Sequence, residues 1–202
     1  MFLSDVDIIK AVKNGDITIR DFSKHRLQPA SYDITLGNKF VLTVGHSTGF
    51  VDPVNNIFPE TEEVIVRKGG TFVLHPGINV LGASVEFFGS DKYLIHLSGK
   101  SSLARIGLMV HNTAGIVNPG HFLNITFELS NVNNIPTILH PGMAIAQITF
   151  SHLSSPPSSS YRQTGRYDNK NWNHFVSEKK RKVTSKKKVV KEVVKKEVKK
   201  KK

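Results

Sequence analysis

Between Ile17 and Leu153 the chain is a succession of short apolar or alternating runs separated by turn residues. Runs such as FVLTV, YLIHL, NITFELS and AIAQITF have the length and apolar content of β-strands. Glycine, proline and asparagine interrupt them at KGG, HPG, NPG and NVNNIP, where they supply the backbone angles that tight turns require. A long series of short strands with turns between them predicts an all-β barrel or sandwich.

One helix is expected ahead of the strands. Ser4 precedes Asp7 at helix-capping spacing, and Gly15 stands where a helix would end. Ile8 and Val12 recur with the spacing of one helical face. The sequence therefore predicts one short amphipathic N-terminal helix, and 202 residues suit a single domain with one core.

The positive charge of the chain is concentrated at its C-terminus. The net charge is +12, and residues 178–202 hold 14 of the 28 lysines and arginines but only 3 of the 16 acidic residues, so they carry +11 and the rest +1. A near-neutral body indicates that the fold is not built around a phosphate backbone. We expect 178–202 to be a solvated, disordered polybasic tail, or a tail that binds nucleic acid or another anionic surface.

Residues 154–177 differ from both the strands and the tail. The stretch SSPPSSSYRQTG is rich in serine and proline and cannot bury an apolar face. Aromatic residues at Tyr161, Tyr167, Trp172 and Phe175 indicate that this segment docks on the protein. The chain thus divides into a domain at 1–153, an extended arm at 154–177 and the tail.

Two absences in the sequence narrow the function. The chain has no cysteine, which excludes disulfides, thiolate nucleophiles and the P-C-x-x-C element of zinc-dependent nucleoside deaminases. No run approaches the roughly 18 apolar residues of a membrane span, and the start has no basic flank before its apolar stretch. We expect a soluble, intracellular, cytoplasmic protein, or a nuclear one if EKKRKVTSKKK, which resembles a nuclear localisation signal, acts as one.

The stretch SGKSS at 98–102 looks like the end of a phosphate-binding P-loop. That loop requires a glycine five positions before Gly99, and Leu94 stands there, so the P-loop interpretation fails. What remains is one lysine and two hydroxyls, with Arg105 shortly after. This set suits oxyanion binding or a polarised water, although a solvated surface turn is the alternative.

A longer pattern surrounds these residues. The run SGKSSLARIGLMVHNTAGIVNPGHFLNITFELSN, with HPGM downstream, resembles the dCTP deaminase family of the dUTPase superfamily, as do FLSDVDI, QPASYDITLG and TFVLHPGINVLGASVEF. The resemblance covers residues 1–153. It implies a dUTPase-like β-barrel or jelly-roll-type fold, a homotrimer with active sites shared between subunits, and conversion of dCTP and water to dUTP and ammonia. It also implies Mg²⁺ held by the nucleotide phosphates, and no zinc.

The same resemblance implies a role for each site residue. Glu128 would be the general base that activates water, with Ser101 and Arg105 positioning that water. The substrate-binding residues would be Lys100 and Ser102 at the phosphates, the backbone of Thr113, Ala114 and Gly115 at the base and sugar, Asn118 at a sugar hydroxyl, Gln147 in support, and Arg166 and Tyr167 from the arm.

The chemistry gives Glu128 a reason independent of the family. Water is a poor nucleophile, and without a metal a positioned carboxylate contributes about two to four orders of magnitude in rate. In FELSN, Glu128 alternates with Phe127 and Leu129 and faces away from them; a solvated strand face is the alternative. His111 is interpreted as structural, with a supporting role near the site, and Asp33 as part of the scaffold or of a subunit contact.

One substitution bears on the product. Family members that go on to split dUTP into dUMP and diphosphate carry aspartate where this chain has Asn118, and an amide cannot accept a proton from water. Gly115 favours the opposite conclusion, because a glycine at this position resembles the bifunctional deaminase-dUTPase branch of the family. We expect dUTP as the product, with a bifunctional deaminase-dUTPase or dUTPase as one alternative. The altered GHFLN stretch and arm leave an inactive nucleotide-binding scaffold with a nucleic-acid-binding tail as the other.

Overall fold

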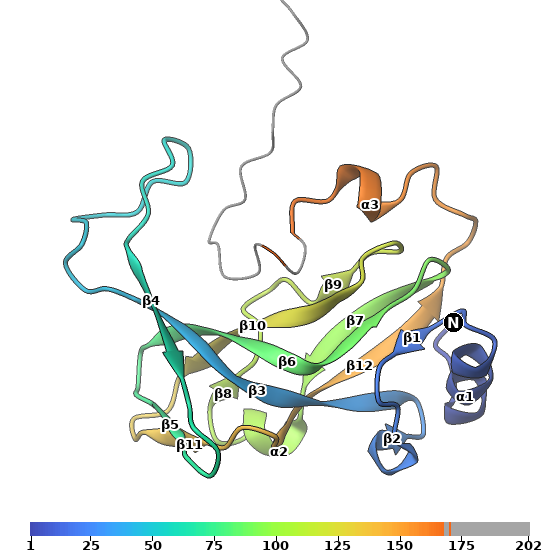
Figure 1. The fold of residues 1–202 in the computed structure, drawn as a ribbon, viewed down its shortest axis with the longest axis horizontal. Helices are drawn as coiled ribbons and strands as arrows, with labels where there is room; N and C mark the ends of the chain where they lie inside the picture. Colours follow the sequence, from blue (N-terminus) through green and yellow to red (C-terminus); the bar gives the residue numbers. More distant parts are fainter. Residues whose placement is uncertain (168–169, 171–202) are drawn as a thin grey trace, which may run out of the picture.

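A computed structural model describes residues 1–167 and Lys170. The predicted tail, Trp172 and Phe175 lie outside the described residues. Within them the chain is mostly β (Figure 1), with strands β1 Thr18–Ile19, β2 Leu27–Gln28, β3 Ser31–Thr43, β4 Thr61–Ile65, β5 Phe72–Leu74, β6 Asn79–Gly89, β7 Tyr93–Gly99, β8 Leu108–Met109, β9 Ile116–Val117, β10 Leu123–Asn131, β11 Thr137–Leu139 and β12 Ala144–His152.

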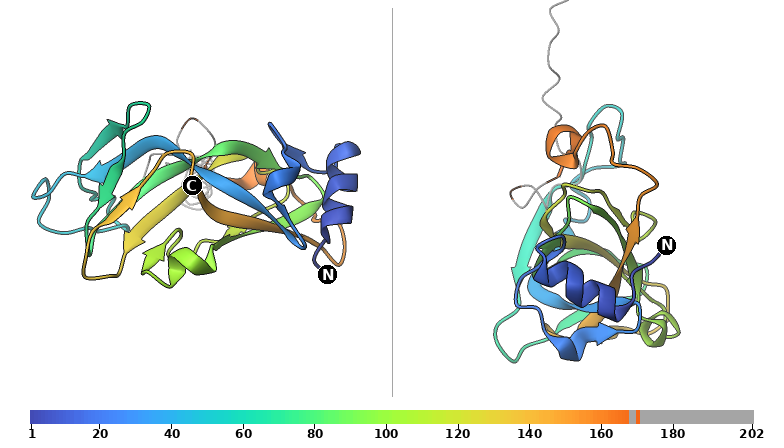
Figure 2. Two further views of the ribbon diagram at one scale, coloured as in Figure 1. Left: turned by 90° about the horizontal axis from the view of Figure 1, so that it is seen from below. Right: turned by 90° about the vertical axis from the view of Figure 1, so that its right-hand side faces the viewer.

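The N-terminal helix lies where the sequence predicts it. Helix α1 (Asp5–Lys13) is capped by Ser4, whose side chain accepts a hydrogen bond from the Asp7 N–H. Gly15, just past its end, has a φ of 77°, which glycine adopts without a steric penalty. Ile8 is fully buried, and α1 lies across one end of the curled sheet (Figure 2). The predicted helix is therefore confirmed.

Most strands form one ten-stranded sheet with the central order β8-β10-β6-β3-β12-β7-β9. Strand β3 joins its two halves: its first part pairs with β12, and its second part pairs with β6 and β4. The sheet curls around a core in which Tyr32, Phe40, Phe127 and Phe150 are fully buried. Figure 2 shows the curl of the strands from two further directions.

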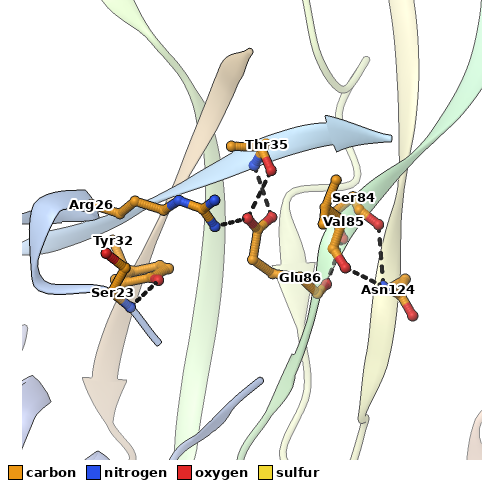
Figure 3. Close-up of polar contacts among 8 residues, drawn as sticks. All are labelled: Ser23, Arg26, Tyr32, Thr35, Ser84, Val85, Glu86 and Asn124. Carbon is orange, nitrogen blue, oxygen red and sulfur yellow. Dashed lines mark hydrogen bonds and ion pairs between the residues drawn. The ribbon is translucent and has the colours of Figure 1, made fainter. Parts of the chain in front are cut away.

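A buried ionic cluster fastens β3 to β6 (Figure 3). Glu86 on β6 is 2% exposed. Its carboxylate accepts hydrogen bonds from the Thr35 N–H at 2.8 Å and the Thr35 hydroxyl at 2.7 Å, and it forms an ion pair with Arg26. Arg26 ends the short 3-10 helix η1 (Lys24–Arg26), so three elements meet at one carboxylate.

The segment between β8 and β9 crosses from one sheet edge toward the other. The Val110 carbonyl accepts a hydrogen bond from the Glu128 N–H on β10, and the Gly115 carbonyl accepts one from the Leu97 N–H on β7. These two bonds fix residues 110–115, named the crossing segment below, to β10 at one end and to β7 at the other.

The start of the arm is not simply extended. Residues Tyr161–Thr164 form a helical turn, α3, capped by Ser160, because Ser160 and Gln163 complete a capping box. Serine and proline content alone did not predict this turn. A second short helix, α2 (Ser101–Ala104), follows β7.

Candidate active site

A pocket of about 460 Å³ lies between β6, β9, β10 and the arm. Four residues singled out from the sequence line it: Ala114, Asn118, Glu128 and Tyr167. The rest of its lining is Asn79, Leu81, Ile116, Val117, His121, Leu123, Ile125, Thr126 and Tyr161. Carboxylate, amide and phenol groups therefore converge on a partly apolar hollow, the composition expected of a small-molecule site.

Glu128 stands on the pocket face of β10. Burial alternates along this strand, and Phe127 and Leu129 are fully buried while Glu128 is half-buried. The alternation predicted from FELSN is thus confirmed. The face of β10 that carries Glu128 lines the pocket and is not simply solvated surface. The Glu128 carboxylate accepts a hydrogen bond of 3.3 Å from the Asn112 N–H.

The electrostatics of Glu128 suit a general base. Burial raises the pKa of Glu128, and this effect outweighs the hydrogen bond from Asn112 and the charge of His111, both of which lower it. A carboxylate with a raised pKa holds a proton more strongly, so it is a better base once ionised. His111 thus lies close enough to influence Glu128, and its supporting role stays a prediction. Its Nδ1 atom is buried and has no hydrogen-bond partner within the described residues.

The crossing segment leaves no room for a side chain at Gly115. A Cβ atom on Gly115 would lie 2.9 Å from the Leu97 carbonyl oxygen and 3.3 Å from the His111 ring, so no side chain has room there. Thr113 and Ala114 are exposed, and Ala114 lines the pocket. Thr113 and Gly115 do not line the pocket of this chain, so the backbone role implied for these three residues stays a prediction.

The arm docks over the end of the pocket on the same chain. The Tyr161 ring stacks on the His121 ring with centroids 3.9 Å apart, and the main-chain N–H of Tyr161 donates a hydrogen bond to the Pro119 carbonyl at 3.1 Å. Arg162 forms an ion pair of 3.1 Å with Asp91. These contacts bring Tyr167 to the pocket. Arg166 lies beside it, lining an adjacent hollow under α3.

The remaining predicted residues gather elsewhere. Lys100 precedes α2, and its ammonium forms an ion pair of 2.6 Å with Asp33. Ser101, Ser102 and Arg105 are exposed along and just after α2. None of these four lines the Glu128 pocket of the same chain. The structure of one copy therefore contains the predicted site as two separate groups.

Gln147 belongs to the second group. It lies on β12 opposite Asp33 of β3 and Ser98 of β7, and its side-chain oxygen accepts a hydrogen bond of 3.2 Å from the Ser31 hydroxyl. Asp33 is 8% exposed, and its Oδ1 atom has no hydrogen-bond partner in the part of the chain that the structure describes. Asp33, interpreted from sequence as scaffold, is thus the counter-ion of Lys100.

Residues 1–167 and 170 contain neither a cluster of metal-ligating side chains nor a helix that could span a membrane. No cluster of three or more histidine, aspartate or glutamate side chains there could ligate a metal ion. None of the helices in this range is long and apolar enough to cross a membrane.

Comparison with known families matches residues 2–153 to the dCTP deaminase-like family. The chain belongs to this family. Two relatives named dCTP deaminase, dUMP-forming, come from Tropheryma whipplei strain Twist and Bifidobacterium adolescentis. They are 44% and 41% identical to this chain over 162 residues, covering 80% of it and 83% and 84% of the relatives. The predicted family is confirmed.

A solved structure extends this result to the fold. The 2'-deoxycytidine 5'-triphosphate deaminase of Agrobacterium tumefaciens aligns with a TM-score of 0.57 and 19% identity over 75% of this chain. The alignment spans 48% of the Agrobacterium protein, about half its length. At this identity the likeness concerns the fold, and it confirms the predicted mostly β architecture, which this chain shares with a solved dCTP deaminase.

Several pocket residues of this dCTP deaminase-like chain were missed by sequence reasoning. Asn79 and Leu81 come from β6, and Leu123 and Ile125 from the start of β10. Tyr161 was noted only as an arm aromatic. Their strands were predictable, but no local pattern identifies which strand residues face one hollow, because that depends on the β6–β10 register.

Proposed function

We propose that this protein catalyses the hydrolytic deamination of dCTP to dUTP and ammonia, with Glu128 as general base. The observation that carries the proposal is the half-buried Glu128 carboxylate with a raised pKa in a pocket that also contains Asn118 and Tyr167. Membership of the dCTP deaminase-like family supports the substrate. The substrate is taken to enter as its Mg²⁺ complex, with the ion held by the phosphates.

The reaction follows from one carboxylate and one water. Glu128 removes a proton as the water oxygen attacks C4 of cytosine, the C4=N3 π electrons move to N3, and the carboxyl gives that proton to N3, which forms a tetrahedral intermediate. The carboxylate then transfers the remaining hydroxyl proton to the amino nitrogen, so that C4=O forms as the C–N bond breaks to release ammonia. Backbone groups of residues 113–115 bind base and sugar, and Asn118 holds a sugar hydroxyl.

A second copy of the chain is proposed to complete the site. Lys100, Ser101, Ser102 and Arg105 provide two cations and two hydroxyls, which suit a triphosphate and a polarised water. They do not line the Glu128 pocket of their own chain. A homotrimer in which α2 of one copy approaches the pocket of the next would bring both groups to one nucleotide, with Gln147 supporting the α2 side.

The identity of the final product rests on Asn118. An amide at the pocket wall can hold a hydroxyl but cannot deprotonate a water for attack on phosphorus, so we propose that the reaction stops at dUTP. A bifunctional reaction ending in dUMP and diphosphate is the second candidate. It is favoured by the relatives of 41–44% identity, which are named dUMP-forming.

The product profile from dCTP tests the proposal. Purified protein with dCTP and Mg²⁺ should release ammonia and accumulate dUTP, and Asn118→Asp should begin to convert dUTP into dUMP and diphosphate. Stoichiometric dUMP and diphosphate from the unchanged protein would establish the second candidate. Nucleotide binding without ammonia or diphosphate would leave only the scaffold alternative.

The bacterial origin of the relatives does not support the nuclear role considered for the tail.

A further inference from the structure

Three polar side chains beside Glu128 have no role in the proposed reaction. The Ser130 hydroxyl lies 2.9 Å from Asn79 Oδ1 and 3.4 Å from Asn112 Oδ1, and it has one proton to donate to either. The Asn112 amide Nδ2 lies 3.5 Å from Asn79 Oδ1. These residues come from β10, β6 and the crossing segment, so the cluster joins three elements at the edge of the pocket.

The strand register explains why the cluster forms there. Ser130 follows Glu128 by two positions on the same face of β10, and it pairs with Asn79 on β6. The crossing segment reaches β10 through the Val110 carbonyl, which accepts from the Glu128 N–H. Asn112 comes two residues later, so its side chain reaches Ser130 and Asn79 while its own N–H points at the Glu128 carboxylate.

We propose that Asn79 and Ser130 are positioning residues: they hold the Asn112 side chain so that its main-chain N–H stays on the Glu128 carboxylate and residues 113–115 stay at the base pocket. The inference rests on the proposed function, and it adds a role for three residues outside the predicted site. Asn112 connects the two groups, because its side chain contacts Asn79 and Ser130 while its main-chain N–H bonds Glu128.

The electrostatic consequence has a definite sign. The Asn112 N–H lowers the pKa of Glu128 against the larger effect of burial, so loosening Asn112 makes that pKa rise further. The other titratable groups to consider are His111 on the crossing segment, which acts on the carboxylate, and three that line the same pocket, His121 before β10 and Tyr161 and Tyr167 on the arm. The variants below leave all four in place, and β6 contributes the neutral residues Asn79 and Leu81 to the lining.

The sharpest test is Asn112→Ala, which keeps the N–H that bonds Glu128 and removes only its anchor. The rate constant kcat/KM for dCTP should be measured against pH for Asn112→Ala, Ser130→Ala and Asn79→Ala. The acid limb of the pH profile should move to higher pH by about half a unit. At pH values below the pKa of Glu128 this shift lowers kcat/KM by roughly threefold, and the loss shrinks at higher pH. Ser130→Thr, which restores a hydroxyl, should recover the original limb.

Controls separate this outcome from general damage and from failure of the proposed function. Asn134→Ala changes an exposed asparagine in the turn after β10 and should leave the acid limb unchanged. If the unchanged protein does not deaminate dCTP, the proposed function fails, but ¹³C NMR titration of the Glu128 carboxyl still reads the pKa directly. Acid limbs or titration curves of Asn112→Ala and Ser130→Ala that coincide with the unchanged protein overturn the positioning role.

Discussion

Replacing Glu86 with glutamine should destabilise the protein by about 2–4 kcal/mol. The change keeps the side-chain shape and removes one charge from a site that is 2% exposed. The Glu86 carboxylate accepts from the Thr35 N–H, the Thr35 hydroxyl and Arg26. An amide offers one acceptor oxygen in place of two, so either the Thr35 N–H or the Arg26 guanidinium must face an NH₂ group.

The magnitude follows from how each freed group is solvated. Removing one partner of a buried ion pair costs about 3–5 kcal/mol when the other charge stays buried. The Arg26 side chain is 35% exposed, so water can solvate the freed guanidinium and lower the cost. For a domain of this size, the expected loss corresponds to a fall of roughly 5–15 °C in the midpoint of thermal unfolding.

Urea unfolding at one fixed protein concentration measures the effect, because any oligomer makes stability depend on concentration. The matched control is Glu63→Gln, which breaks the exposed 3.9 Å pair with Lys39 and should cost less than about 1 kcal/mol. Equal unfolding midpoints for Glu86→Gln and Glu63→Gln would refute the reasoning, since they would mean that burial adds nothing to the Glu86 pair.

Four further predictions concern the site, the arm and the tail. Glu128→Gln should raise the midpoint of thermal unfolding at neutral pH. Burial raises the pKa of Glu128, so the ionised carboxylate destabilises the folded protein at pH values above that pKa. The gain should vanish at lower pH, and a lower midpoint for the variant at neutral pH would contradict the prediction. Gly120→Ala should release the arm, because Gly120 has a φ of 85° and a Cβ there would lie 1.9 Å from Ser160 Oγ; limited proteolysis should then cut faster in 154–167, and unchanged cleavage would argue against this docking. Co-expressed Lys100→Ala and Glu128→Gln chains should regain activity in verified mixed oligomers that neither variant has alone, whereas no recovery would mean that one copy supplies both residues. Deleting 178–202 should abolish salt-sensitive DNA binding but keep deamination, and DNA binding that survives the deletion would contradict the tail's assigned role.

The elements of the fold that could be predicted are those encoded by short local sequence patterns. Helix α1 follows from Ser4, Gly15 and the spacing between them, and strands such as β7, β10 and β12 follow from apolar runs between turn residues. Each of these signals is contained in a few consecutive residues, so no long-range information is needed.

The parts that were missed depend on distant partners. Arg26 and Glu86 are 60 residues apart, and a glutamate on a strand is ordinarily a surface residue. Turn α3 depends on Gly120, which leaves room for Ser160 in a Ser-Pro-rich stretch. The site shows the same division: alternation put Glu128 on one face of its strand, but only the register of β6 with β10 determines that Asn79 and Leu81 share its pocket.

The rate of ammonia release from saturating dCTP tests the central claim about Glu128 most directly. The measurement compares the unchanged protein, Glu128→Gln and Glu62→Gln, which alters an exposed glutamate on β4. Glu128→Gln should be slower by about two to four orders of magnitude, while Glu62→Gln should match the unchanged protein. Ammonia release by Glu128→Gln at the rate of the unchanged protein would contradict the assignment of Glu128 as the base.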